Sequence, residues 1–215
     1  TVCTYLVPLW GMGSDLTKGG KLNLDTREAR QPFQLYGRMK QAGVLPKNIA
    51  EIPTDRIRID MQAGNLIFAM SWGYVWNRLE NDADSKVKGK IGVARLPHDQ
   101  GGSSATCIGG WQVAVTAFSK NKQEAVKFAR YLSSPEVSKM QAILASHLPV
   151  FPSVYRDPDV LKANPWFADA LPVIESAKAR PVTHQYPQVS DAIRSNMNAY
   201  LAGTKTTDTA LADMK

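Results

Sequence analysis

Several aromatic side chains and one arginine stand at positions where binding groups usually gather. Trp72 and Tyr74 follow a short apolar run, and Trp111 follows two glycines. Arg180 directly precedes a proline. Element ends and loops carry many binding residues. A flat aromatic ring can stack on the C–H face of a sugar, and an arginine offers a fork of N–H donors to hydroxyl groups.

Residue type alone leaves more than one interpretation of these positions. A tryptophan near the end of a strand more often packs in a core than binds a ligand. Trp76 and Trp166 are therefore assigned to packing, and Trp10 is a second-tier candidate for binding. Gly110 either lets the backbone approach a ligand and offer its N–H, or occupies a turn that needs a positive φ. Both interpretations of this glycine stay open.

The residue patterns that metal or nucleophilic catalysis requires are missing from the sequence. The three histidines lack the spacing of a zinc site, and no nucleophile elbow, P-loop or complete dinucleotide fingerprint occurs. Asp82 and Asp84 lie in a loop-like stretch followed by lysines, where a general acid would not be desolvated. The sequence therefore predicts no metal, no cofactor and no catalytic residues. The histidines are His98, His147 and His184.

Length and charge exclude some classes of protein. The 215 residues are 44% hydrophobic, enough to fill the core of one large domain or two small ones. The net charge is +7, but the basic residues are scattered and usually stand near acidic ones. The densest basic cluster, residues 86–90, reads as a solvated loop. The sequence therefore predicts no nucleic-acid partner.

The two cysteines, Cys3 and Cys107, are more than a hundred residues apart. No C-x-x-C pair occurs, and the sequence does not show that the two thiols meet. They are therefore either free thiols or the partners of one disulfide.

The apolar patterns predict strands alternating with helices. Strands are expected at residues 1–10, 66–70, 90–96 and 111–116. Capping-box patterns at Asp25–Glu28 and Asn121–Glu124 and the pair Ser134-Pro135 each predict the start of a helix. Further helices are expected at residues 54–62, 159–163, 166–177, 187–201 and 208–214. Strands spaced by helices predict an α/β fold.

Four segments, in order along the chain, resemble the extracytoplasmic sugar-binding proteins of bacterial ABC importers. The similarity is greatest to members of the trehalose/maltose-binding type and covers nearly the whole chain. The segments are residues 1–16, 64–76, 86–128 and 179–193. The short elements that carry it are Trp72-Gly73-Tyr74, Gly109-Gly110-Trp111 and Ala179-Arg180-Pro181.

The resemblance implies a two-lobed, type II periplasmic-binding-protein-like α/β fold. Residues 1–103 and 148–215 would then belong to the C-terminal lobe, and residues 104–147 would form a crossover segment in the N-terminal lobe. Members of this family are close to twice as long, so the chain is expected to be the C-terminal part of a larger protein. The remaining N-terminal lobe would complete the binding cleft.

The resemblance also assigns roles to the candidate binding residues. Trp72 and Trp111 would be stacking faces, Tyr74 would add a ring or a phenolic hydrogen bond, Gly110 would approach the ligand, and Arg180 would donate to hydroxyl groups. The sequence departs from the family pattern at Gly73, usually a larger residue, and at His184, often a proline. Both departures would alter which sugar fits.

The function that these observations imply is a receptor that captures a sugar, such as the disaccharides trehalose or maltose, between two lobes. It would deliver the sugar to the membrane permease of an ABC importer. A periplasmic or extracellular location follows, either free or anchored through a lipidated N-terminus beyond this chain. Two alternatives are a carbohydrate-active hydrolase, which needs a buried acid pair, and a basic interaction module, which needs clustered charge with interleaved aromatics.

Overall fold

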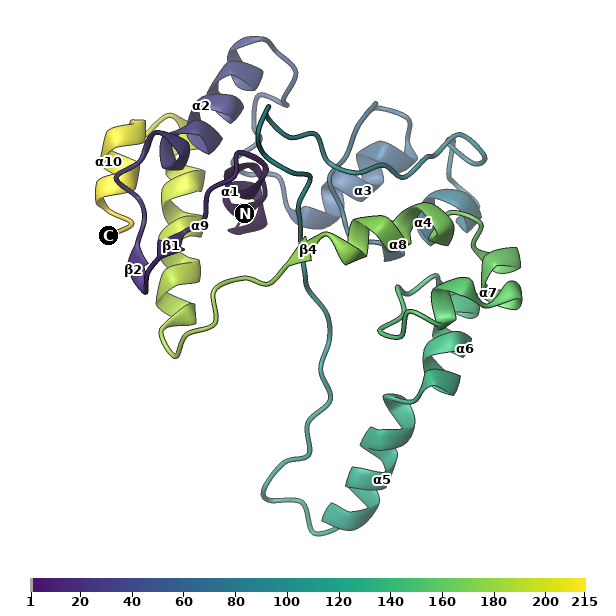
Figure 1. Ribbon diagram of the computed structural model, residues 1–215. Helices are drawn as coiled ribbons and strands as arrows, with labels where there is room; N and C mark the ends of the chain where they lie inside the picture. The colour runs from purple at the N-terminus through teal and green to yellow at the C-terminus, as the bar shows by residue number, and fades with distance from the viewer. Residues whose placement is uncertain (1) are drawn as a thin grey trace. The chain divides into compact units, whose positions relative to one another are not determined.

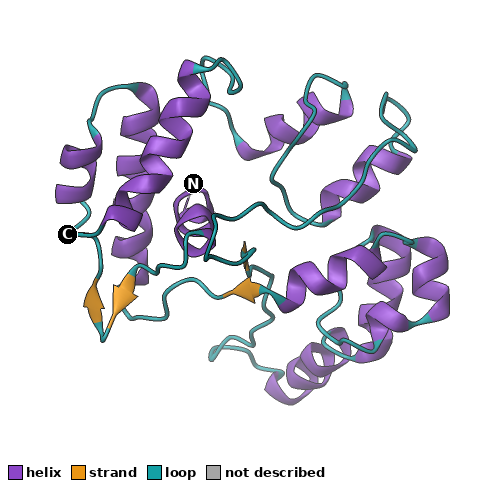
Figure 2. Cartoon of the chain, turned by 45° about the horizontal axis from the view of Figure 1, so that its top comes forward, coloured by secondary structure: helices purple, strands orange, loops and turns teal. Residues whose placement is uncertain are grey.

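The computed structural model describes residues 2–215, which divide into two compact units (Figures 1 and 2). Unit 1 contains the chain up to Ile52, then Arg95–Gly109 and Val173–Lys215. Unit 2 contains Pro53–Ala94 and Gly110–Pro172. Each unit is thus assembled from stretches that are far apart in the sequence.

Unit 1 is a group of helices with two very short sheets. Helix α1 packs against α2, α9 and the strand β3, and α10 packs against α2 and α9. Strands β1 and β2 are antiparallel, whereas β3 and β4 are parallel. The elements are α1 Val2–Gly11, β1 Thr17–Lys18, β2 Lys21–Leu22, α2 Arg27–Gln41, β3 Thr106–Cys107, β4 Ala177–Lys178, α9 Tyr186–Ala202 and α10 Thr207–Ala212.

An aromatic cluster joins three helices in the core of unit 1. The ring of Phe33, on α2, lies 5.4 Å from that of Tyr5 on α1 and 5.1 Å from that of Tyr200 on α9. Phe33 and Tyr5 are fully buried. The Tyr5 hydroxyl donates a 3.0 Å hydrogen bond to the carbonyl oxygen of Ala29, and burial raises the pKa of this phenol. The buried hydroxyl is therefore satisfied, and α1 is fixed to α2 by a polar contact as well as by packing.

The first apolar run of the chain forms a helix, so the strand predicted for residues 1–10 is wrong from residue 2 onward; Thr1 lies outside the described residues. A short continuous apolar run does not distinguish a buried strand from a buried helix. Trp10 is buried in this helix, and its Nε1 donates to Oδ1 of Asp15 at 3.1 Å. This second-tier candidate for binding is a core residue of unit 1.

The loop after residue 96 closes over the end of α1. The amide of Asp99 donates to the carbonyl oxygen of Gly11 at 3.2 Å. A Cβ atom on Gly102 would lie only 1.9 Å from the same oxygen. The glycine is needed here because two segments of backbone approach each other more closely than a side chain allows.

Unit 2 contains a second group of helices. Helix α3 packs against α4, α5 packs against α6, and α6 packs against α7 and η1. The last residues of α8 continue into unit 1. The elements are α3 Thr54–Gln62, α4 Tyr74–Asn81, α5 Lys122–Leu132, α6 Pro135–Ala145, the 3-10 helix η1 Val154–Arg156, α7 Pro158–Ala163 and α8 Phe167–Glu175.

Two tryptophans stack on each other inside unit 2. The rings of Trp76 and Trp166 lie 5.5 Å apart at an interplanar angle of 28°, and Phe167 meets Trp166 edge-on at 4.7 Å. The prediction that Trp76 and Trp166 serve packing is confirmed. Nearby, the buried Asn164 donates a 2.8 Å hydrogen bond to the carbonyl oxygen of Ala142. This bond ties the end of α7 to α6.

The three internal strands that the sequence predicts are not formed. Residues 66–70, 90–96 and 111–116 are irregular, and Ile67 and Phe68 are 85% and 89% exposed. A strand needs a neighbour to pair its backbone N–H and C=O groups, and these segments pair with no other strand in the part of the chain that the structure describes. These three segments thus have the apolar pattern of a strand, but no neighbouring strand among the described residues pairs with them.

The predicted helix starts agree with the structure better than the predicted strands do. Helix α2 is capped by Thr26, whose hydroxyl accepts from the amide of Ala29 at 3.1 Å; the predicted cap, Asp25, forms an ion pair with Lys215 instead. The side chain of Asn121 makes no capping hydrogen bond, although α5 begins at the next residue. Across residues 2–215, no helix is both long and apolar enough to cross a membrane.

Candidate functional site

Unit 2 presents three aromatic side chains of the predicted site at its surface. Trp72 and Tyr74 are 42% and 40% exposed, and Trp111 is exposed along its whole side chain. None of the three rings packs against another aromatic ring among the described residues. An exposed aromatic ring leaves a face open to a ligand.

Close packing around Gly73 sets the position of the first two aromatics. Tyr74 is the first residue of α4, which is anchored by its buried residues Val75 and Leu79. A Cβ atom at Gly73 would lie 2.6 Å from Cδ1 of Leu148. The small residue at this position therefore makes room for the Leu148 side chain, which would have to shift to accommodate a larger residue.

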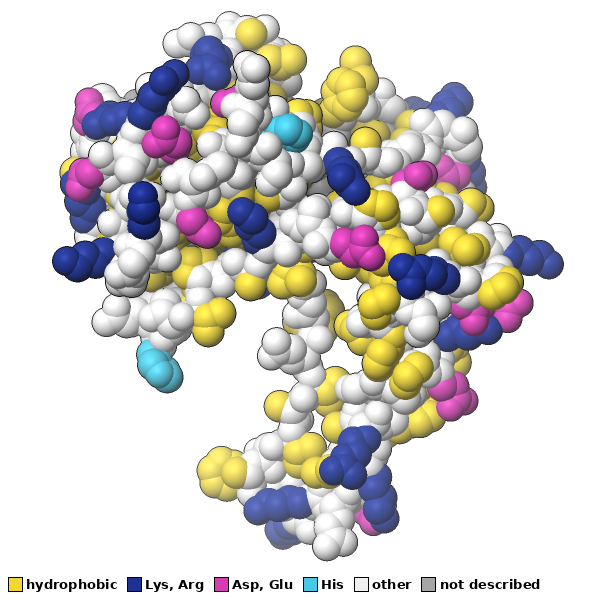
Figure 3. Space-filling model, viewed as in Figure 1, with side chains coloured by type: hydrophobic (Ala, Val, Ile, Leu, Met, Phe, Trp, Pro, Cys, Tyr) yellow, Lys and Arg dark blue, Asp and Glu magenta, His cyan; other side chains and the backbone are white. Residues whose placement is uncertain are grey.

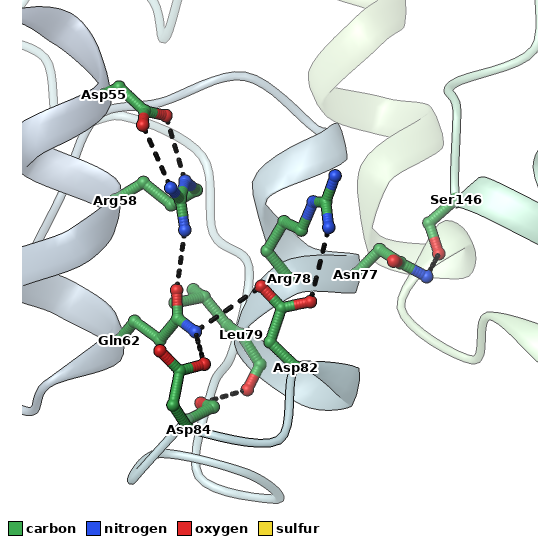
Figure 4. Close-up of polar contacts among 10 residues, drawn as sticks. Asp55, Arg58, Gln62, Asn77, Arg78, Leu79, Asp82, Asp84 and Ser146 are labelled. Atoms are coloured by element: carbon green, nitrogen blue, oxygen red, sulfur yellow. Dashed lines mark hydrogen bonds and ion pairs between the residues drawn. The ribbon is translucent and has the colours of Figure 1, made fainter.

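A polar network joins α3 to the segment that follows α4 (Figure 4). The buried Gln62 donates from Nε2 to Oδ1 of Asp84 at 2.6 Å and accepts at Oε1 from Arg58 at 2.7 Å. Arg58 also pairs with both carboxylate oxygens of Asp55 at 2.9 Å, and this hydrogen bonding lowers the pKa of Asp55. A longer bond of 3.4 Å links Gln62 to Asp82. Asp82 and Asp84 are thus parts of a structural network that holds α4 in place.

Gly110 and Trp111 lie on an irregular segment at the start of the second stretch of unit 2. Gly110 does not have a positive φ, so the interpretation as a turn glycine that needs left-handed backbone is wrong. Apart from Gly110 itself and its two neighbours in the chain, no atom of the described residues lies within 4 Å of where its Cβ would stand. The backbone is therefore open to solvent, as close approach to a ligand would require, and that role stays a prediction.

Replacing Gly110 with alanine provides a test of close approach. Since the site is open and φ is ordinary, Gly110→Ala is expected to leave the melting temperature within about 1 °C of the original. If the backbone lies against the ligand, the added methyl group weakens binding by about 10-fold. Titration calorimetry on the full-length protein measures this, with Gly92→Ala as the matched control because its Cβ position is also empty. Unchanged affinity would remove Gly110 from the site.

Arg180 lies in unit 1, two residues after β4. It is half-buried, and its guanidinium carbon stands 5.6 Å from the centre of the Tyr186 ring, a cation–π distance. The guanidinium also lies near Cys3 and Cys107, where its positive charge favours the thiolate form of each, although the pKa of Cys107 is raised overall by its contact with Cys3 and by burial. The Tyr186 ring therefore supports the position of the arginine.

A polar hollow in unit 1 was not predicted from the sequence. Its volume is about 460 Å³. It lies beside β4 and is lined mainly by cationic and hydroxyl side chains, which could donate to a polar ligand. The signal in the sequence was the run of charged and hydroxyl residues between 95 and 104, which was interpreted as a strand end and a turn. The polar lining residues are Arg95, His98, Ser103, Ser104, Ser176 and Lys178.

The described residues contain no group of three or more His, Cys, Asp and Glu side chains that could hold a metal ion. The predicted site consists instead of aromatic faces, one arginine and open backbone. Four of its five residues, Trp72, Tyr74, Gly110 and Trp111, belong to unit 2, and Arg180 belongs to unit 1.

Comparison with known proteins agrees with this kind of site. The family model of the bacterial extracellular solute-binding proteins matches residues 7–169. A "Probable ABC transporter-binding protein" of Deinococcus radiodurans is 38% identical over 196 residues, which cover 89% of this chain and 46% of that protein. The chain thus spans about half the length of the curated relatives it matches.

Solved structures extend the comparison to the fold. T. maritima MalE3 with maltose bound is 32% identical and superposes with a TM-score of 0.93, covering 99% of this chain and 55% of that one. A solute-binding protein of Thermotoga lettingae bound with α-D-tagatose is 25% identical, with a TM-score of 0.84, covering 100% of this chain and 54% of that one. These likenesses confirm the predicted α/β, type II periplasmic-binding-protein-like fold. The chain belongs to the bacterial extracellular solute-binding proteins, a family of transport binding proteins and not of enzymes.

Proposed function

We propose that the full-length protein containing this chain is the substrate-binding component of an ABC importer and captures a sugar, with disaccharides such as maltose and trehalose as the first candidates. The observation that carries the proposal is the full exposure of Trp111 next to the open backbone of Gly110. A fully exposed indole ring has its apolar faces open, so that the C–H face of a sugar can stack on it.

The chemistry of the two units suits a sugar. Trp72, Tyr74 and Trp111 offer flat apolar faces for the C–H surfaces of pyranose rings. Sugar hydroxyls lose water on binding and must find hydrogen-bond partners, which Arg180 and the donors around the polar hollow supply. No acidic pair is needed for this task, and Asp82 and Asp84 are engaged by Gln62.

The other wall of the site is proposed to come from the remaining half of the protein. Residues 104–147 would lie in the N-terminal lobe, and residues 1–103 and 148–215 in the C-terminal lobe. Apolar side chains on α5 and α6 are exposed (Figure 3), as expected of a surface that further protein covers. These side chains are Val126, Phe128, Tyr131, Met140 and Leu144.

Ligand contacts to both lobes would favour a closed, hinge-bent form that the permease recognises. A receptor that captures a solute for import acts outside the cytoplasm, which agrees with the extracellular solute-binding family. The protein is then periplasmic or extracellular, either free or held by a lipidated N-terminus.

Titration calorimetry of the full-length protein with a panel of solutes tests the proposal. The panel contains trehalose, maltose, sucrose, longer glucans, tagatose, ribitol and the common amino acids. A micromolar or tighter response to a sugar, at one ligand per protein, is the expected result. A response to an amino acid or to no sugar at all would overturn the assignment of the substrate class.

The chain by itself is expected to bind the same sugar at least about 100-fold more weakly than the full-length protein, because roughly half of the contacts would be lost. Both proteins can be compared by calorimetry at the same temperature and salt. Circular dichroism of the 215-residue chain serves as the control for folding. Equal affinities would show that one wall of the site is sufficient.

A further inference from the structure

The two cysteines, far apart in the sequence, meet in unit 1. Cys3 lies on α1 and Cys107 lies on β3, and these two elements pack against each other. Cys107 is part of the buried core of unit 1, and Cys3 packs against that core, with the two side chains near enough to influence each other's pKa. The Cys107 thiol donates a long hydrogen bond of 3.9 Å to the carbonyl oxygen of Ile108. The structure thus answers a question that the sequence leaves open: the thiols are neighbours.

We propose that Cys3 and Cys107 form an intramolecular disulfide in the secreted protein, which joins α1 covalently to β3 beside Arg180. Both residues are thiols in the structure described here. The extracellular location of the family favours the oxidised form, because disulfides persist outside the cytoplasm. The inference does not depend on which solute the protein binds.

The surroundings of the pair decide which thiol reacts first. The contact with Cys107 lowers the pKa of Cys3 to about 7, against an opposing effect of burial, and the positive charge of Arg180 adds to the lowering. The same contact and burial raise the pKa of Cys107. Cys3 is also the more exposed of the two. Because its pKa is lowered and it is the more exposed thiol, Cys3 is expected to react first, and Cys107 in the second step.

The oxidant is an external disulfide, either a small molecule such as oxidised glutathione or a thiol oxidoreductase. The Cys3 thiolate attacks one sulfur of that disulfide, forms a mixed disulfide and releases the other sulfur as a thiolate, which takes up a proton. Cys107 then loses its proton and attacks the Cys3 sulfur, which releases the second external thiol. Two protein thiols are oxidised, and one external disulfide is reduced to two thiols.

The covalent bond would reinforce the part of unit 1 that carries Arg180. Strand β3 pairs in parallel with β4, and the amide of Ile108 donates to the carbonyl oxygen of Lys178 at 2.8 Å. Arg180 lies two residues after the end of β4. Fixing β3 to α1 therefore limits the motion of the strand pair that presents this arginine.

Peptide mapping of the full-length protein tests the proposal. The protein is incubated with oxidised and reduced glutathione at pH 7.5, alkylated with iodoacetamide without reduction, and digested with trypsin. The expected product joins the peptide containing Cys3 to the peptide of residues 96–120, with the mass of two hydrogens lost. Reduction of this bond is expected to lower the melting temperature by about 10 °C. Recovery of both cysteines as alkylated thiols under these conditions would overturn the proposal.

Single serine variants distinguish a disulfide between these partners from unrelated oxidation. Cys107→Ser leaves Cys3 without its resolving thiol, so Cys3 is expected to retain one glutathione. Cys3→Ser leaves the buried Cys107, which is expected to remain unmodified on the same timescale. The Cys3→Ser/Cys107→Ser double variant has no thiols at these positions, so its melting temperature should be the same with and without reductant. Faster modification of Cys107 than of Cys3 would contradict the proposed order of attack.

Discussion

Replacing Trp111 with alanine in the full-length protein is expected to weaken sugar binding by about 100-fold and to leave the melting temperature unchanged. The size of the effect follows from the loss of a whole stacking surface at the centre of the proposed site. The fold should not respond, because the Trp111 side chain is fully exposed and is not packed into the core of the residues that the structure describes. Calorimetry and thermal unfolding measure the two quantities on the same preparation.

A control for Trp111 stands on the same segment. Phe118 is 94% exposed and also aromatic, but it belongs to no element of the predicted site. Phe118→Ala is therefore expected to change the affinity less than about 3-fold. Equal losses in both variants, or tight binding by Trp111→Ala, would assign Trp111 to contacts between parts of the protein and not to the ligand.

The Phe33→Ala substitution is expected to lower the free energy of unfolding by about 3–5 kcal/mol. Phe33 is fully buried and contacts Tyr5 and Tyr200, so removing its ring leaves a cavity where three helices meet. The helices cannot collapse into this space easily, because the Tyr5 hydroxyl is bonded to Ala29. Urea denaturation of the full-length protein, followed by circular dichroism, measures the loss.

The matched control for Phe33 is Val44, which follows the end of the same helix and is 67% exposed. Val44→Ala is expected to cost less than about 0.5 kcal/mol. A loss for Phe33→Ala no greater than for this control would mean that the aromatic cluster is not the packed core of unit 1.

Local chemistry made several helices predictable from the sequence. The Ser134 side chain accepts from the amide of Val137 at 3.2 Å, and Pro135 starts α6, as the Ser-Pro pair indicates. Gly203 ends α9 with a φ of 83°, a conformation that glycine adopts without strain. Such signals act within a few residues, so they do not depend on the rest of the chain.

The strands and the binding site could not be predicted from local sequence patterns alone, because both depend on contacts between distant segments. Residues 66–70 have the composition of a buried strand, but pairing is a property of a partner segment, and Phe68 stays exposed. The exposure of Trp72 and Trp111 agrees with the predicted binding surface, whereas their contact with a sugar remains a prediction. The meeting of Cys3 with Cys107 and the polar hollow beside β4 both result from tertiary packing, which spacing along the sequence did not reveal.

The interleaved layout of unit 1 also determines when it can fold during synthesis. Helix α1 packs against α9, although the whole of unit 2 lies between them in the sequence. At about 5–20 residues per second, the ribosome needs roughly 10–40 s to make the stretch that separates these helices. During this interval the apolar side chains of α1 must stay exposed to water or be covered by another molecule. Unit 2 can begin to form earlier, so the core of unit 1 should be the last part of this chain to close.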